Sequence, residues 1–428
     1  MLPEGAPAYL RLMSGGLYED LTTRGLMVTH REEQPRGDIR ILVPTQIEFI
    51  SYPYEWCFSQ LRDAALLTLR IQRTALEHGM CLKDASAYNV QFQGSRPIFI
   101  DTLSFEPNRP GPWNAYDQFC RHFLAPLLLM AYRWDTFNQF LLAMPDGFPL
   151  SLTSSLLPWH SYFRPAALLH VHLHARAQAS AGTGAQPSRE SLPDRKQALV
   201  ESLEAAVQNL HAARRRSAWS GYYEERTHYT ADAERFRRDF VVHTLLEHRP
   251  ALVFDLGANR GDYSRLTGEL GFRCVSFEMD GACAEQAYRS AKAASSGEVL
   301  SLRMDLRNPT PGIGFRAKER MGLLDRPRAC MLLALALIHH LRISGQAPLA
   351  HIARFFADLG DQHLLLEFVP KEDPMVRAML AHRSDIFDDY TLEGLWKAFA
   401  PLWEPVATQP IPGSPRTLCL FRKREIVS

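Results

Sequence analysis

This sequence lacks several features, such as paired cysteines and an excess of one charge, that would by themselves indicate a class of protein. Its seven cysteines are scattered along 428 residues, odd in number, and include no C-x-x-C pair. The pattern argues against a zinc site and against a disulfide framework, and it suits a reducing compartment such as the cytoplasm. Lysine plus arginine number 48 against 47 aspartates and glutamates. This balance gives no reason to expect nucleic acid or an anionic membrane as a partner.

Long apolar segments are also missing. The longest runs, Phe123 to Met130 and Ala329 to Ile338, are about half as long as a transmembrane helix requires. Residues 1–16 contain no apolar core suited to a signal peptide. With 46% hydrophobic residues, the chain can form two or three domains that each bury a core. We therefore expect a soluble, cytoplasmic protein without membrane association.

One polar segment divides the sequence. Residues 178–196 are rich in glycine, serine and proline and too polar to pack. We predict a first domain over residues 1–177, a flexible linker over 178–196 and a second domain over 197–428. An amphipathic helix is expected over residues 198–216, at the start of the second domain.

The most informative stretch is Ala251 to Asp262, which reads Ala-Leu-Val-Phe-Asp-Leu-Gly-Ala-Asn-Arg-Gly-Asp. An apolar run, a glycine turn and then helical spacing predict a buried strand that leads into a helix. A dinucleotide fingerprint places a pyrophosphate on bare amides, whereas here Asp255 and Asp262 would repel phosphate and attract a cation. S-adenosylmethionine carries an ammonium and a sulfonium, so it suits the acidic turn better. The alternative is a connection that binds no ligand.

Strands and helices alternate after this turn. Further strands are predicted at Cys274 to Phe277, Val299 to Met304, Ala329 to Leu337 and His363 to Val369, followed by a hairpin over residues 402–422. Such alternation predicts a parallel sheet covered by helices on both faces.

At these residues the chain resembles the class I S-adenosylmethionine-dependent methyltransferases, over roughly residues 218–421. The resemblance implies a Rossmann-like α/β domain with a seven-stranded, mostly parallel sheet that closes in an antiparallel hairpin. It also implies that the methionine end of the cofactor is held by Asp255, Gly257, Asn259 and Gly261. The ribose would then meet Glu278, and the adenine would meet Asp305 and Leu306.

Four segments are similar to a little-described, nodulation-protein-like bacterial branch of these enzymes. They are Trp219-Ser-Gly-Tyr-Tyr, Leu335-Ala-Leu-Ile-His-His-Leu, Glu367-Phe-Val-Pro-Lys-Glu-Asp-Pro-Met-Val and Ser414-Pro-Arg-Thr-Leu. In this fold the segment before the first strand commonly covers the cofactor, so Tyr222, Tyr223, His228 and Tyr229 are candidates for the site. The alternative is ordinary aromatic packing under a helix that is predicted from Thr230 to His248. Arg416 could bind an anionic group of the substrate or could face solvent.

Candidate catalytic groups follow the fourth and fifth strands. His339 and His340 are expected to titrate near neutrality, so either could act as a general base. The alternative is that one histidine caps the helix and the other is buried and hydrogen-bonded. Glu367 could orient a histidine or a substrate amine, or could pair with Arg342 or Lys371. A metal is not required, and no third ligand has suitable spacing.

The first domain has a weaker pattern. Asp84 and Asn89 have the D-x-x-x-x-N spacing of a kinase catalytic loop, and Asp101 ends a strand where kinases keep a metal ligand. This resembles a degenerate kinase-like α+β domain, because no lysine precedes Lys83 and the glycine-rich loop is missing. The alternative is that Asp84 and Asn89 hold a turn.

Together these patterns predict a methyltransferase acting on a hydroxyl or amine of a small molecule or carbohydrate. The alternatives are an inactive binding or scaffold protein and a bifunctional kinase and methyltransferase.

Overall fold

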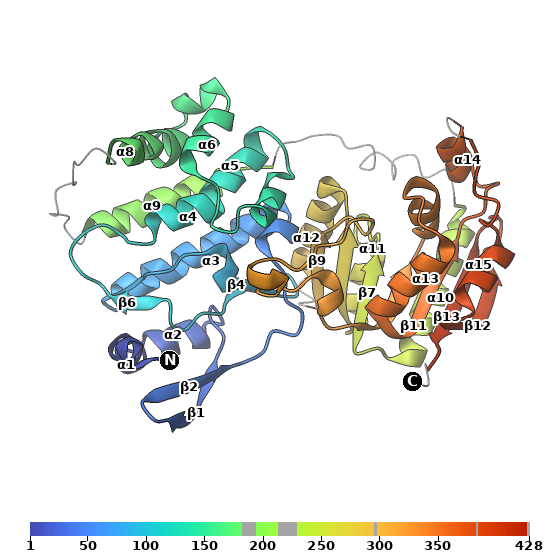
Figure 1. Cartoon of the computed structure of the whole chain (residues 1–428), viewed down its shortest axis with the longest axis horizontal. Coiled ribbons are helices and arrows are strands. Elements are labelled where there is room, and N and C mark those ends of the chain that lie inside the picture. The colour runs from blue at the N-terminus through green and yellow to red at the C-terminus, as the bar shows by residue number, and fades with distance from the viewer. Residues whose placement is uncertain (182–193, 213–228, 295–297, 382–383, 426–428) are drawn as a thin grey trace. The chain divides into compact units, whose positions relative to one another are not determined.

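The computed structural model describes residues 1–181, 194–212, 229–294, 298–381 and 384–425. The chain divides into two compact units, Met1–Arg214 and Arg215–Ser428, coloured blue to green and yellow to red in Figure 1.

The second unit is built on one sheet. Its strands are β7 (Leu252–Leu256), β8 (Arg273–Glu278), β9 (Val299–Arg303), β10 (Ala329–Ala334), β11 (Gly360–Phe368), β12 (Trp403–Pro410) and β13 (Thr417–Lys423). They lie in the order β12-β13-β11-β10-β7-β8-β9. Strands β7 to β11 pair in parallel, whereas β13 pairs antiparallel with both β11 and β12. The predicted α/β class and mostly parallel sheet are confirmed.

Helices pack on both faces of this sheet. They are α10 (Ala231–His248), α11 (Asp262–Glu269), α12 (Gly281–Ala294), α13 (Leu349–Leu359), α14 (Pro374–Leu380) and α15 (Leu392–Phe399). Alternate strand residues point to opposite faces. On one face Val253 and Leu333 share a core with Val241 of α10. On the other face Phe421 contacts Phe399 of α15, which contacts Phe356 of α13. The two cores hold the strand ends in place.

Strand β10 is shorter than the sequence predicted. It ends at Ala334, not at Leu337, because Ala336 has a left-handed backbone with φ 52°. This turn directs the following residues across the carboxyl edge of the sheet.

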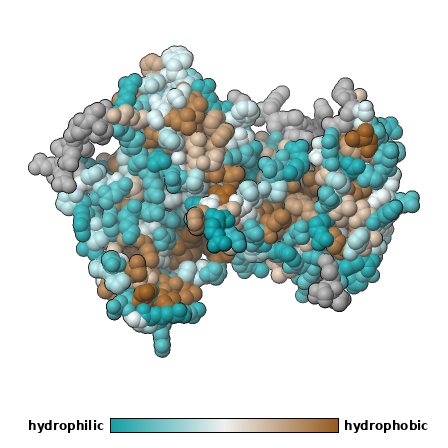
Figure 2. Space-filling model, viewed as in Figure 1, coloured by the Kyte–Doolittle hydropathy of each residue, from teal (hydrophilic) through white to brown (hydrophobic). Residues whose placement is uncertain are grey.

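The first unit is a mixture of helices and short antiparallel ribbons. Its helices are α1 (Ala6–Ser14), α2 (Leu17–Thr23), α3 (Phe58–Glu77), α4 (Tyr116–Phe119), α5 (Ala125–Tyr132), α6 (Leu150–Leu156), α7 (Pro165–Ala167), α8 (His174–Ala181) and α9 (Asp194–Gln208). The ribbons pair β1 (His30–Arg36) with β2 (Ile39–Pro44), β3 (Met80–Leu82) with β6 (Phe105–Pro107), and β4 (Val90–Gln93) with β5 (Arg96–Phe99). Figure 2 shows a mostly hydrophilic surface with scattered apolar patches.

The predicted domain boundary is wrong by one helix. Helix α9 packs on α3 in the first unit, and the units divide at Arg214 instead of within residues 178–196. Glu204 of α9 accepts a 2.7 Å hydrogen bond from Arg73, and Lys196 donates to Asn108 at 2.7 Å. The polar segment therefore precedes the last helix of the first unit. The expected helix over 198–216 ends at Gln208, and residues 213–216 lie outside the described residues.

Candidate functional site

A pocket of about 240 Å³ opens at the carboxyl edge of the parallel strands. This edge is where open α/β sheets bind ligands. Six of the seven predicted cofactor residues line it: Asp255, Gly257, Asn259, Glu278, Asp305 and Leu306. Residues far apart in the sequence are thus brought to one cavity, although their individual roles stay predictions.

The turn after β7 is shaped by glycine. Gly257 has φ 73°, and a Cβ there would lie 3.0 Å from Leu337. The N–H groups of Gly257 and Ala258 donate to the carbonyl of Phe277 at 2.9 and 3.1 Å, which ties the turn to β8. Gly261 lies outside the pocket. With φ 77° and a Cβ position 2.9 Å from Ala287, it permits α11 and α12 to pack closely.

Asp255 is a buried carboxylate at the end of β7. It is 4% exposed, and its Oδ2 accepts a 2.5 Å hydrogen bond from the Ser264 hydroxyl. Among the described residues it has no cationic partner within salt-bridge distance. Burial, together with the charge of Glu278, raises the pKa of Asp255 to about 6 against the hydrogen bond from Ser264. An ionised Asp255 therefore carries a buried charge that no cation of the described residues compensates.

Glu278, at the end of β8, also stabilises the turn. Its two carboxylate oxygens accept hydrogen bonds from the backbone N–H groups of Asn259 at 2.7 Å and Asp280 at 2.8 Å. Burial raises the pKa of Glu278 despite these hydrogen bonds. Asn259 has a left-handed φ of 50° and a buried Oδ1 without a hydrogen-bond partner, so this acceptor could serve a ligand.

Asp305 follows β9 and holds an arginine in place. Its carboxylate accepts hydrogen bonds from the backbone N–H and from Nε and Nη2 of Arg307, at 2.8 to 3.0 Å. Burial alone would raise the pKa of Asp305, but the hydrogen bonds and charge of Arg307 outweigh it and lower the pKa. Both residues line the pocket, on the side opposite to β11.

The two candidate histidines are placed differently. His340 begins a turn of π-helix, η10 (His340–Ser344), and lines the pocket. His339 is 2% exposed, lies outside the pocket and has an Nδ1 without a hydrogen-bond partner. Burial and then the charges of Arg307 and Arg416 lower the pKa of His340 to about 4, so its imidazole is neutral at pH 7. Only His340 is positioned to meet a ligand.

Glu367 is fully buried and sits in a cluster of charged groups. Its Oε2 accepts a 2.6 Å hydrogen bond from Arg237, and its Oε1 accepts hydrogen bonds from the Tyr229 hydroxyl and from Arg416. The predicted partners were wrong. Arg342 pairs with Asp389 at 2.6 Å, and Lys371 pairs with Asp385 at 2.7 Å.

Arg416 is buried, not solvent-facing. It is 2% exposed, and its Nε and Nη2 donate to the two carboxylate oxygens of Asp373 at 2.7 and 3.2 Å. It also donates to the Tyr229 hydroxyl. The guanidinium carbons of Arg237 and Arg416 lie 4.3 and 4.6 Å from the centre of the Tyr229 ring. Of this cluster, Tyr229, Arg237 and Arg416 line the pocket, whereas Glu367 and Asp373 do not.

Sequence reasoning missed Arg237 and Arg307. Arg237 lies in the helix that the sequence predicted, but the segment Arg235-Phe-Arg-Arg gives no local signal of which arginine turns inward. Tyr222, Tyr223 and His228 lie outside the described residues.

The kinase-like residues of the first unit are engaged in local hydrogen bonds. Asp84 accepts from the backbone N–H of Ser86 at 2.9 Å, which confirms that it holds a turn. Asp101 accepts a 2.5 Å hydrogen bond from the Ser104 hydroxyl, which in turn accepts from Asn89 at 3.2 Å. The described residues contain no cluster of three metal-ligating side chains. The resemblance to kinases stays a prediction.

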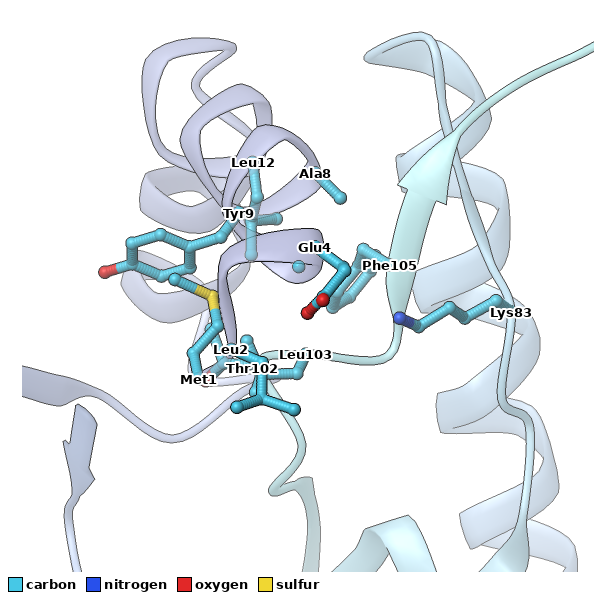
Figure 3. A pocket seen from close by; sticks show the side chains of 11 residues that line it. Met1, Leu2, Glu4, Ala8, Tyr9, Leu12, Lys83, Thr102, Leu103 and Phe105 are labelled. Carbon is cyan, nitrogen blue, oxygen red and sulfur yellow. The ribbon is translucent and has the colours of Figure 1, made fainter. Parts of the chain in front are cut away.

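A separate cavity of about 430 Å³ lies in the first unit, between α1 and the loop that leads into β6. Figure 3 shows the Lys83 side chain extending toward the wall that carries Glu4, among apolar side chains such as Leu103 and Phe105. Asp84, Asn89 and Asp101 do not line it.

The chain resembles known proteins, one of them over most of its length. Nodulation protein NoeA from Rhizobium meliloti (strain 1021) is 36% identical over 421 residues, which cover 95% of this chain and 88% of that protein. No family model matches the chain. Within its described residues, no helix is both long enough and apolar enough to cross a membrane.

Two solved structures resemble part of the chain. The N-methyltransferase NodS from Bradyrhizobium japonicum WM9 in complex with S-adenosylhomocysteine is 12% identical, with a TM-score of 0.35 over 48% of this chain and 98% of NodS. The magnesium protoporphyrin IX methyltransferase from Synechocystis PCC 6803 with bound S-adenosylmethionine is 16% identical, with a TM-score of 0.34 over 45% of this chain and 80% of that enzyme.

Proposed function

The chain belongs to the family of nodulation protein NoeA, and we propose that it is an S-adenosylmethionine-dependent methyltransferase. The proposed acceptor is a hydroxyl or amine of a small molecule or carbohydrate. The observation that carries the proposal is the buried Asp255 carboxylate, which lines a pocket at the strand edge without a cationic partner in the described structure.

The charge of the pocket favours this cofactor over a dinucleotide. Asp255 and Glu278 are two buried acids on neighbouring strands, and a pyrophosphate beside them would be repelled. The ammonium of S-adenosylmethionine would instead compensate Asp255. An ionised carboxylate has about four acceptor sites, and backbone N–H groups occupy only part of those of Glu278, so it can still accept from ribose hydroxyls.

Methyl transfer requires alignment and removal of a proton. The sulfonium is a good leaving group, so the acceptor attacks the methyl carbon as the carbon–sulfur bond breaks. We propose that the neutral imidazole of His340 accepts the proton of a hydroxyl or ammonium acceptor. Tyr229 and Leu341, which also line the pocket, would help to exclude water from it.

Replacing His340 should slow transfer more than replacing His339. A positioned general base contributes about 10²- to 10⁴-fold, and a base with a pKa of about 4 belongs at the low end, near a hundredfold. Candidate acceptors are incubated with S-adenosylmethionine, and mass spectrometry follows the gain of one CH₂ unit for the wild type, His340→Ala and His339→Ala. Equal losses in both variants would contradict the role of His340.

Binding tests the proposal without an acceptor. Calorimetry should detect S-adenosylhomocysteine and should detect no binding of NAD. If the chain bound NAD and ignored S-adenosylhomocysteine, the proposed function would be wrong. If calorimetry detected binding of neither S-adenosylhomocysteine nor NAD, a binding or scaffold protein would be favoured. A thermal shift with ATP and magnesium that is lost in Asp101→Ala would favour a bifunctional enzyme.

The affinity for S-adenosylhomocysteine should weaken as the pH falls from 7.5 to 5. Below its pKa of about 6, Asp255 of the free protein is protonated and cannot pair with the ligand ammonium. Binding must then release a proton, so each pH unit below 6 costs about tenfold in affinity. Calorimetry at several pH values measures this slope, and Asp255→Asn should bind weakly with no such slope. An affinity that does not change over this range would contradict the prediction.

The cysteines support a cytoplasmic location, which we also propose. All seven are free, and six of them are buried, as expected in a reducing compartment.

A further inference from the structure

The cavity of about 430 Å³ in the first unit takes no part in the proposed methyl transfer. Its volume lies within the range of about 300–1,000 Å³ that is usual for small-molecule sites. Leu12 of α1 and Phe105 of β6 are buried in its apolar wall, together with the partly exposed Leu103. This wall can bury the apolar part of a small ligand.

Two charged side chains face one another across this cavity. Figure 3 shows the ammonium of Lys83 and the carboxylate of Glu4 pointing toward each other from opposite walls. Both residues are exposed, and neither side chain forms an ion pair or a hydrogen bond within the part of the chain that the structure describes. Each charge is therefore available to a ligand group of opposite sign.

Thr102 adds a free hydroxyl to the lining of the cavity. The residue is 7% exposed, and its hydroxyl has no hydrogen-bond partner among the described residues. A hydroxyl can both donate and accept hydrogen bonds. Thr102 can therefore donate to a ligand carboxylate.

The kinase-like aspartates hold the two turns that carry these residues. Asp84 directly follows Lys83, and its carboxylate accepts a hydrogen bond from a backbone N–H two positions further on, at 2.9 Å. Asp101 directly precedes Thr102 and accepts in the same way, also at 2.9 Å. The backbone N–H of Lys83 donates to the carbonyl of Ser104 at 2.9 Å, which joins the two turns. The two aspartates are thus placed to support the lining of the cavity.

We propose that this cavity binds a free α-amino acid with an apolar side chain. Glu4 binds the ammonium of the ligand, whereas Lys83 and the Thr102 hydroxyl bind its carboxylate. The ligand side chain packs on the wall that contains Leu12 and Phe105. An α-amino acid carries both charges on one carbon, so a single head group can contact both charged side chains.

Charge favours this ligand over a nucleotide or a fatty acid. Either of these would bring only negative charge to the cavity, and Glu4 would repel it. The site shares no residue with the pocket of the second unit, so the inference does not depend on the proposed function.

Three probes with the same carbon skeleton test the two charges separately. Leucine carries both charges, leucinamide keeps only the ammonium, and 4-methylpentanoate keeps only the carboxylate. Calorimetry is run at a pH of about 6.5, below the α-amino pKa of about 8. The wild type should bind leucine about fivefold more tightly than either analogue, as expected for one lost ion pair at an accessible site.

Variants of the two charged residues should affect different probes. Lys83→Met should weaken leucine about fivefold and leave leucinamide within about twofold. Glu4→Gln should weaken leucine by a similar factor and should not weaken 4-methylpentanoate. Thr102→Val, which keeps the shape of the side chain, should weaken both leucine and 4-methylpentanoate. Both charged residues are exposed, so their variants should fold like the wild type.

Controls remove the same charges elsewhere in the first unit. Arg70→Met and Glu19→Gln change exposed residues outside the cavity and should alter none of the three affinities. If the wild type did not bind leucine, or bound 4-methylpentanoate equally well, the proposed site would be wrong. Equal weakening of leucine and leucinamide by Lys83→Met would also overturn it. S-adenosylhomocysteine should bind the Lys83 and Glu4 variants like the wild type, so a failure of this site is distinguished from a failure of the proposed function.

Discussion

Asp255→Asn is expected to weaken S-adenosylhomocysteine binding by roughly 30-fold or more, because truncating one partner of a buried charge pair costs about 2–5 kcal/mol. Asparagine has nearly the same shape and can still accept the hydrogen bond that Ser264 donates at 2.5 Å. The substitution therefore removes the negative charge with little change in packing. Calorimetry and thermal shift measure the loss. At a hundred times its dissociation constant the ligand should stabilise the wild type by about 2.7 kcal/mol.

The same substitution should not destabilise the ligand-free protein at pH 8. The pKa of Asp255 in the folded state, about 6, lies above its ordinary value of 3.8. A raised pKa contributes stability that is fully present below pH 3.8 and is lost as the pH rises through 6. At pH 8 the buried charge is a cost, so Asp255→Asn should raise the melting temperature of the free protein there and not at pH 4.

The matched control is Asp262→Asn in the first turn of α11. The Asp262 side chain is 45% exposed and lies 3.9 Å from Arg265, outside the pocket. The Asp262→Asn variant should bind S-adenosylhomocysteine with the affinity of the wild type. If Asp262→Asn lost as much affinity as Asp255→Asn, the total negative charge of the turn would explain binding better than an ion pair between Asp255 and the ligand ammonium.

The sequence predicts strand β7, the glycine turn and helix α11 well, because the residues that determine these elements lie next to one another in the chain. An apolar run followed by glycines with positive φ at Gly257 and Gly261 specifies the strand, the turn and the helix within twelve residues. The sequence also predicts that the acids at the ends of β8 and β9 lie near this turn, because parallel strands bring their carboxyl ends to one edge of the sheet.

The charged cluster could not be predicted, because its partners are distant in sequence. Glu367 meets Arg237 and Arg416, which are 130 and 49 positions away, whereas a sequence suggests only nearby partners such as Lys371. The prediction of the domain boundary was wrong for a related reason. Composition identifies a polar segment, but it does not tell which unit the following helix packs against, and α9 returns to α3.

Arg416→Ala is expected to destabilise the second unit by about 3–5 kcal/mol, because removing one partner of a buried ion pair leaves uncompensated charge. Here the loss would leave Asp373, which is 2% exposed, without its bidentate partner, and Glu367 with one cation fewer. For a unit of this size the melting temperature should fall by roughly 6–20 °C. Scanning calorimetry measures the fall, and the transition that S-adenosylhomocysteine shifts identifies the second unit.

Arg422→Ala is the matched control, because it removes the same residue type from the strand that directly follows Arg416. Arg422 pairs with Glu404 at 2.9 Å, but the two side chains are 60% and 44% exposed, so water solvates both charges when the pair is broken. Its melting temperature should stay close to that of the wild type. If the two variants lost equal stability, burial of the cluster would not be the cause. If Arg416→Ala alone fell and Arg416→Ala with Asp373→Asn recovered part of the loss, the unpaired carboxylate would be identified as the source of the instability.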